Sequence, residues 1–147
     1  MIGNMLPSEA CAVVATIDPD AYTATTYNSD VIDMSLFESL MVVLMAGTLG
    51  SGATLAAAVH TSAAAGSGFA ALTGKATTAL TEAGTDSDKQ AIINLRAEDL
   101  PDGHRYVRIV ATLGTATSDF GVVVFGVRPR RGPANDNDLA SVAEIVA

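Results

Sequence analysis

Short runs of alternating or continuous apolar residues recur along this chain at intervals of about ten residues. In residues 105–113, for example, Val107, Ile109 and Ala111 alternate with more polar positions, and turns rich in Gly, Pro and Asp separate the runs. This pattern predicts about eight antiparallel strands, so we expect an all-β sandwich, jelly-roll-like, over residues 12–127. The expected strands are residues 12–17, 22–27, 40–46, 53–61, 72–80, 90–98, 105–113 and 121–127.

One expected strand, residues 40–46, is apolar on both of its faces. Leu40, Val42 and Leu44 lie on one side of it. Three further apolar residues alternate with them on the other side, namely Met41, Val43 and Met45. A strand that is apolar on both sides is covered on both, either inside the fold or under a neighbouring subunit. We therefore take these three residues as candidate partner-binding positions.

The same region has to be tested for a membrane span, because residues 39–74 carry no formal charge when His60 is neutral. Residues 47–52, with three glycines, interrupt the apolar run, and no Lys or Arg flanks its start. We therefore expect two buried strands joined by a glycine turn, and no membrane partner. Thr48-Leu49-Gly50 and Thr112-Leu113-Gly114 each follow such a strand, and we interpret both as hairpin turns.

Composition narrows the class of protein further. The chain has 147 residues, which suits one domain. Its 16 acidic and 8 basic residues give a net charge of −8, which makes nucleic acid a poor partner. Cys11 is the single cysteine, so neither a disulfide framework nor a multi-cysteine metal site forms within one chain.

The two ends differ from the alternating region, and we expect an N-terminal arm over residues 1–11 and a C-terminal arm over residues 128–147. Three of the six arginines lie together at the start of the C-terminal arm, namely Arg128, Arg130 and Arg131. This cluster is either a solvated exit from the last strand or a contact with an acidic neighbouring surface. Residues 139–147 are compatible with one short helix that has Asp138 as its N-cap, and such a segment is either an arm that docks on a partner or a frayed end.

A search for catalytic chemistry finds no constellation. His60 and His104 have no carboxylate at a suggestive spacing, and no Gly-x-Ser-x-Gly motif is present. The glycine-rich residues 47–52 lack the Lys-Ser/Thr ending of a phosphate loop. Asp86-x-Asp88 and Asp136-x-Asp138 lack the twelve-residue loop of a calcium site. We therefore expect no enzyme, no catalytic residue, no cofactor and no metal.

Three phrases give the chain a family resemblance. They are Phe37-Glu38-Ser39-Leu40 running into the two-sided strand, Arg105-Tyr106-Val107-Arg108-Ile109-Val110 after a turn, and Arg128-Pro129-Arg130-Arg131 at the exit of the last strand. In this order they resemble small virion structural proteins of tailed bacteriophages and prophages, of the head decoration (cement) type. The resemblance implies a non-enzymatic virion protein, assembled in the host cytoplasm. The partners it implies are the major capsid protein and further copies of the chain, as a trimer or another cyclic homo-oligomer.

Three alternatives stay open at this stage. A tail or head–tail adaptor protein would have the same resemblance. A carbohydrate-binding sandwich of a tail fibre or baseplate would have the same fold class. The absence of Trp and the small number of tyrosines disfavour that second alternative. A hydrolase built on a sandwich is the third, and the two isolated histidines disfavour it.

Overall fold

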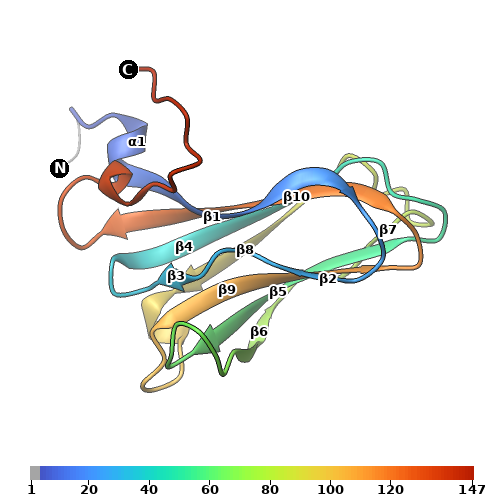
Figure 1. Cartoon of the computed structure of the whole chain (residues 1–147), viewed down its shortest axis with the longest axis horizontal. Coiled ribbons are helices and arrows are strands. Elements are labelled where there is room, and N and C mark those ends of the chain that lie inside the picture. The colour runs from blue at the N-terminus through green and yellow to red at the C-terminus, as the bar shows by residue number, and fades with distance from the viewer. Residues whose placement is uncertain (1–3) are drawn as a thin grey trace.

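The computed structural model describes residues 4–147 and places most of them in two antiparallel β-sheets (Figure 1). Ten strands occur among these described residues. They are β1 (Cys11–Tyr22), β2 (Thr26–Asn28), β3 (Ile32–Asp33), β4 (Phe37–Ala46), β5 (Thr54–Ser62), β6 (Ala70–Ala76), β7 (Leu80–Thr81), β8 (Gln90–Arg96), β9 (Tyr106–Gly114) and β10 (Ser118–Pro129). The helices are one-turn segments: α1 (Pro7–Ala10), η1 (Ala97–Asp99) and η2 (Ala134–Asn137).

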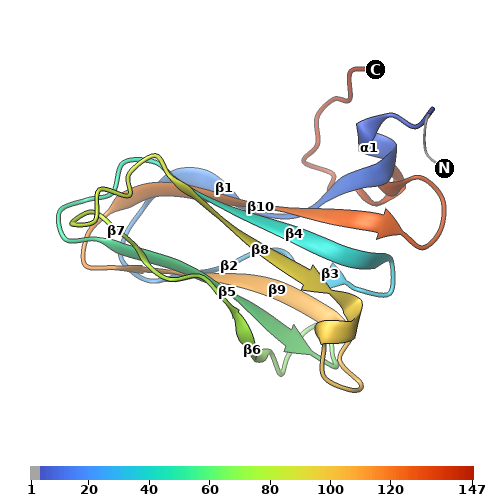
Figure 2. The same ribbon diagram turned by 180° about the vertical axis from the view of Figure 1, so that it is seen from behind.

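The strand order confirms the expected all-β antiparallel sandwich. Sheet A has the order β1-β10-β4-β8, and sheet B has the order β2-β9-β5-β6. The connections from β4 to β5, from β8 to β9 and from β9 to β10 cross from one sheet to the other, whereas β5 and β6 are neighbours within sheet B. Short β3 also pairs with β9, and short β7 with β5, so the eight strand positions are filled by ten strands. Figure 2 shows the two sheets from behind, with β8 and β6 in the foreground.

Every second residue of the long strands points between the two sheets, and these inward side chains are apolar. In β4 the inward residues Leu40, Val42 and Leu44 are each at most 2% exposed. Val107 and Ile109 of β9 are fully buried opposite them, in the second sheet. Burial of such side chains is the dominant favourable contribution to folding, so this period of two is what fixes each strand's orientation.

Two turns that we expected to be hairpins are crossovers between the sheets. Residues 47–53 lead from β4 in sheet A to β5 in sheet B, and residues 115–117 lead from β9 in sheet B to β10 in sheet A. The two segments lie against each other. The Gly47 N–H donates to the Asp119 carbonyl at 2.7 Å, and the Gly50 N–H donates to Ser118 Oγ at 2.9 Å. The expected hairpins are therefore wrong, because each strand finds its ladder partner in a distant part of the chain.

The apolar segment tested as a membrane span forms β4 and β5 and the crossover between them. Among residues 4–147, no helix has the length and apolarity needed to cross a bilayer.

The first strand is longer than its sequence pattern indicates. The segment Asp18-Pro19-Asp20, expected as a turn, continues β1 through a register shift between Ile17 and Asp20. Pro19 lies at this bulge, where a strand can accommodate a residue without an N–H. An ideal Cβ built on Gly121 of β10 would lie 3.1 Å from Pro19 Cα, so the bulge passes directly over Gly121.

The short helix considered for residues 139–147 does not form, and the C-terminal segment instead docks on its own sandwich. Val13 N–H donates to the Asp138 carboxylate at 2.8 Å, and Leu139 N–H donates to the Val13 carbonyl at 2.9 Å. Asp138 therefore completes the edge of β1 in place of capping a helix, and so short a helix is marginal without packing. Ala134 in η2 is fully buried, which ties the segment to the core.

The N-terminal segment lies beside it. Helix α1 contacts η2, and both chain ends leave the sandwich at one corner (Figures 1 and 2). Residues 1–3 of the expected N-terminal arm lie outside the described residues.

An ion pair between Arg105 and Asp33 links the residue before β9 to the short strand β3 beside it. The Arg105 guanidinium donates two hydrogen bonds to the Asp33 carboxylate, at 2.7 and 2.8 Å. These bonds lower the pKa of Asp33 from 3.8 to about 2. A folded-state pKa below the unfolded value stabilises the fold above pH 4, and this contribution is lost as the pH falls from about 4 to about 2. Asp33→Asn should lower the free energy of unfolding by at most about 1 kcal/mol at pH 7, because solvent screens the pair.

Urea denaturation at several pH values checks this prediction. The difference between Asp33→Asn and the wild type should shrink as the pH falls from about 4 to about 2, where half of the Asp33 carboxylates in the folded wild type are protonated, and the rest should be lost below that pH. A difference that stays constant from pH 7 to pH 2 would contradict the assignment to the Asp33 carboxylate.

Candidate protein-binding surface

The candidate partner residues of β4 lie on the outer face of sheet A, opposite the core. Met41 and Val43 are half-buried there, and Met45 is 50% exposed. Their alternation with the buried side of the strand places all three in one column along β4. The structure therefore brings the three residues together, and no described part of the chain covers Met45.

Neighbouring strands extend this column into an apolar surface. Val43 lies between Val123 of β10 and Ile92 of β8 in the ladder, and Met41 lies beside Phe125 of β10. Ile92 is 58% exposed, whereas Val123 and Phe125 are half-buried. We define the outer face of sheet A by six residues: Met41, Val43, Met45, Ile92, Val123 and Phe125.

Sequence reasoning missed three of these residues, Ile92, Val123 and Phe125. Ile92 interrupts an alternating run, which was a visible signal of a second apolar face. Only the pairing of β4 with β8 and β10 reveals that the three belong to one surface with Met41, Val43 and Met45.

Two of the candidate arginines lie at one end of this surface. Arg128 and Arg130 line an open groove of about 880 Å³ together with Met41 and Arg96. Two carboxylates, those of Glu38 and Glu98, also line it, and Glu98 is bonded to Arg96 at 3.1 Å. The groove therefore carries three positive and two negative side chains at the exit of β10.

The backbone at Arg128 has an uncommon conformation. Its φ of +57° lies in the left-handed region, which costs a residue with a Cβ on the order of 1 kcal/mol. Val127 pairs with Ser39 on the outer side of the ladder, and the turn of the backbone brings the next residue, Arg128, into the same groove. Two successive side chains at the end of β10, those of Val127 and Arg128, therefore line the same groove.

The third candidate arginine lies beyond that groove. Arg131 lines a separate hollow of about 650 Å³ with Leu36 and Asp136, and only Arg130 is shared between the two. Leu36 is 42% exposed, so this corner also combines an apolar side chain with a positive charge.

The opposite end of the outer face of sheet A is acidic. An open hollow of about 640 Å³ lies between the Pro19 bulge and Met45, and Gly121 and Val123 of β10 contribute to its lining. Asp20 and Asp119 line it, and none of the described residues lining it is basic. The surface therefore runs from a groove rich in arginine, across an apolar centre, to an acidic hollow.

Groups with potential catalytic chemistry lie apart from each other. Burial, together with the charge of Arg108, lowers the pKa of His60 on the outer side of β5. His104 bonds Thr61 Oγ1 through Nδ1 at 2.8 Å, in a turn outside the strands. Within residues 4–147, no three His, Cys, Asp or Glu side chains gather as a metal site would require.

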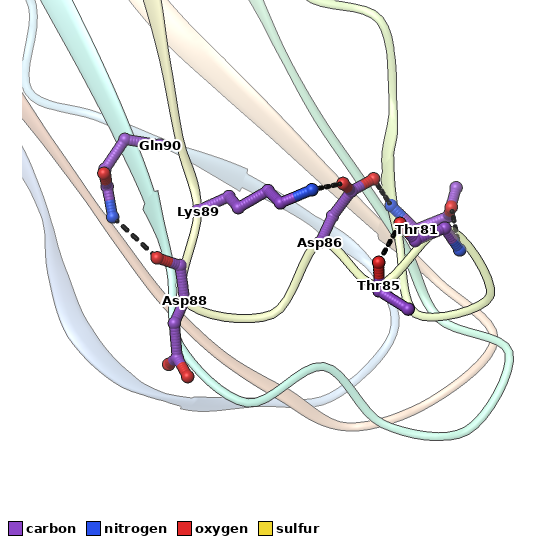
Figure 3. Close-up of polar contacts among 7 residues, drawn as sticks. Thr81, Thr85, Asp86, Asp88, Lys89 and Gln90 are labelled. Atoms are coloured by element: carbon purple, nitrogen blue, oxygen red, sulfur yellow. Dashed lines mark hydrogen bonds and ion pairs between the residues drawn. The ribbon is translucent and has the colours of Figure 1, made fainter.

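Asp86 and Asp88, considered above as possible calcium ligands, lie in the loop before β8. Asp86 accepts a hydrogen bond from Lys89 Nζ at 2.9 Å and another from the Thr81 N–H at 3.0 Å. Figure 3 shows the carboxylate of Asp88 directed away from that of Asp86. The two carboxylates therefore do not converge on one position.

Comparisons with known proteins give a fold but no family. No family model matches the sequence, and no curated protein matches it. Among solved structures, the PBSX exported protein XepA matches with a TM-score of 0.53 and 13% identity over 95% of this chain. The chain spans less than half of XepA, 44% of its length. At 13% identity this likeness concerns the fold alone.

Two further solved structures come from different classes of protein. One, of infectious bursal disease virus, has a TM-score of 0.43 and 14% identity, covering 86% of this chain and 37% of that chain. The other, a carbohydrate-binding module of family 28 described as specific for non-crystalline cellulose, has a TM-score of 0.43 and 12% identity, covering 81% of this chain and 74% of that one. Structural neighbours thus include both viral proteins and carbohydrate-binding modules.

Proposed function

We propose that the chain is a non-enzymatic structural protein of a phage particle, a decoration protein that binds the head lattice and stabilises it. The observation that carries the proposal is the outer face of sheet A, an apolar surface that ends in an arginine-lined groove. Met45 and Ile92 are 50% and 58% exposed on it. Large apolar side chains gathered on one exposed sheet face are typical of a protein–protein contact.

The particle itself makes this function physically reasonable. A decoration protein is bound in many copies to a repeating shell, so weak contacts at each copy act together. The sandwich gives such a protein a rigid body, and the phage resemblance of the three sequence phrases supports a virion location. The fold likeness to the PBSX exported protein XepA is compatible with this proposal.

The corner formed by Arg131 and Leu36 is the proposed contact with the shell. Both side chains are exposed, and Arg131 offers a planar guanidinium that pairs with carboxylates in two hydrogen bonds. Arg131→Glu reverses one charge and should weaken attachment by about tenfold or more, because each copy then presents a negative group to the carboxylates that we propose as its contact on the shell.

Co-sedimentation of the purified chain with particles from which the decoration layer has been removed measures attachment. Lys89→Glu is the matched control, since it makes the same charge change at an exposed residue that does not line the hollow of Arg131. Lys89→Glu should bind as the wild type does. Failure of the wild type to sediment with the particles, or equal binding by Arg131→Glu, would contradict the proposal.

A second candidate function rests on one hollow at the edge of β1. Tyr22 and Tyr27 line this open hollow of about 470 Å³ together with Asp18 and Asp30, and aromatic side chains combined with a few polar groups are typical of small-molecule sites. The tyrosine rings also pack on each other, with centroids 4.4 Å apart. Binding of a soluble oligosaccharide that is lost in Tyr27→Ala would favour a carbohydrate-binding module over a decoration protein.

A further inference from the structure

We propose that two copies of the chain pair through the outer face of sheet A, about a twofold axis that crosses the strands at Val43. The proposal deepens the proposed function, because it names the first partner of that surface as a second copy of this chain. It rests on three features of the surface: an apolar centre, opposite charges at its two ends, and a side chain and a hollow at matching positions.

The apolar centre lies in the row that contains Val43. In the ladder this row runs from Thr16 through Val123 and Val43 to Ile92. The next rows on either side place Met41 and Met45 in the same column of β4. A twofold axis along the central row sets Val43 against the partner's Val43, so the apolar residues of both copies leave water together.

Charge selects the direction of the axis. Two identical sheet faces can meet with their strands parallel or antiparallel. The parallel arrangement would place the groove of Arg128 and Arg130 on the same groove of the other copy. An axis across the strands reverses their direction and places this groove on the acidic hollow of Asp20 and Asp119. Opposite charges attract only in the second arrangement, and they do so twice because the contact is symmetric.

Shape agrees with the same arrangement. Along β10, Phe125 lies two residues on one side of Val123, and Gly121 lies two residues on the other side. Reversing the strand direction about the central row sets Phe125 of one copy opposite the row of Gly121 in the other, where the Pro19 bulge covers the glycine. The hollow opens beside the Pro19 bulge, toward Met45, and is lined mainly by apolar atoms. The aromatic side chain of each copy thus meets the hollow of the other.

The first test measures self-association without any particle. In sedimentation velocity the wild type should move as a species of twice the 14.9 kDa chain mass. Val43→Asp places two like charges against each other at the axis, and it should raise the dimer dissociation constant by about 100-fold or more. Thr112→Asp is the matched control, because Thr112 is an exposed residue on the outer side of sheet B. This control should remain dimeric, and far-UV circular dichroism should show both variants folded.

The second test examines the direction of the strands. The double variant Arg128→Glu with Arg130→Glu should weaken the dimer by about tenfold, because both ends of the contact then carry like charges. Adding Asp20→Arg and Asp119→Arg to the same chain should restore the wild-type affinity, since the reversed ends again oppose each other. Restoration would not follow from a parallel arrangement, in which the two ends never meet.

Three outcomes would overturn the proposal. The first is a wild-type chain that stays monomeric at every concentration up to the millimolar range. The second is a dimer that Val43→Asp leaves intact, and the third is a charge reversal that the added Asp20→Arg and Asp119→Arg changes do not restore. Each of these results leaves the particle-binding experiment to be judged on its own, because a monomer can still attach to a shell through Arg131. A stable dimer with no affinity for particles would instead contradict the decoration function alone.

Discussion

Replacing Phe37 with alanine is expected to lower the free energy of unfolding by about 3–5 kcal/mol. Phe37 is the first residue of β4 and is 1% exposed. Its ring lies so close to Gly126 of β10 that a Cβ built there would be 2.7 Å from it. Truncation would leave a cavity over Gly126, on the core side of the two strands that also carry the outer face. A loss of this size is a large part of the stability of an ordinary domain.

Urea denaturation followed by far-UV circular dichroism measures this loss. The adjacent residue gives a matched control, because Leu36 is 42% exposed and Leu36→Ala should change stability by no more than about 0.5 kcal/mol. If Phe37→Ala costs less than about 1 kcal/mol, the ring does not pack over Gly126 in the core as the structure describes.

Replacing Gly50 with alanine should cost about 1–3 kcal/mol, or more if the backbone has to move. A Cβ at Gly50 would overlap the backbone carbonyl of Thr117 and come within 2.8 Å of the Ala116 Cβ. The same residue donates its N–H to the buried Ser118 hydroxyl. The added methyl group would therefore separate the two crossovers that connect the sheets.

The same denaturation experiment tests this effect against Gly66→Ala. A Cβ at Gly66 meets no atom within 4 Å, so this control should leave stability unchanged or raise it slightly. Equal stability of the Gly50→Ala and Gly66→Ala chains would show that the crossovers do not pack as described.

The sandwich was predictable because burial imposes a period of two on every strand, and a period of two is visible in sequence. The partner of each strand was not predictable. Gly47 and Gly50 suit a hairpin and a crossover equally well, since both need a tight backbone. Which of the two forms depends on pairing between β4 and β10, far apart in sequence. The Asp18-Pro19-Asp20 segment was misread for a related reason, because a bulge and a turn use the same residue types.

The candidate surface was predictable in part. Because β4 is apolar on both faces, the sequence indicated Met41, Val43 and Met45 as residues that a partner covers. The residues around them come from β8 and β10, and no local pattern says that these strands flank β4. The sequence indicated Arg128 only through the cluster of positive charges to which it belongs. Its left-handed backbone, which brings the side chain into the groove, depends on how β10 ends. The tail helix was misread because Asp138 finds the N–H of Val13, a partner that only the fold supplies.

The pairing of the first strand with the last has a consequence for biosynthesis. β1 lies against β10 over most of its length, and β10 in turn pairs with β4. While the ribosome is still making the chain, the centre of sheet A is missing, and β1 and β4 each present an unsatisfied edge. Sheet A can form only after β10, near the end of the polypeptide, has emerged from the ribosome. Until then the unpaired edges of β1 and β4 can pair with other nascent chains, unless a low concentration of chains or a chaperone prevents it.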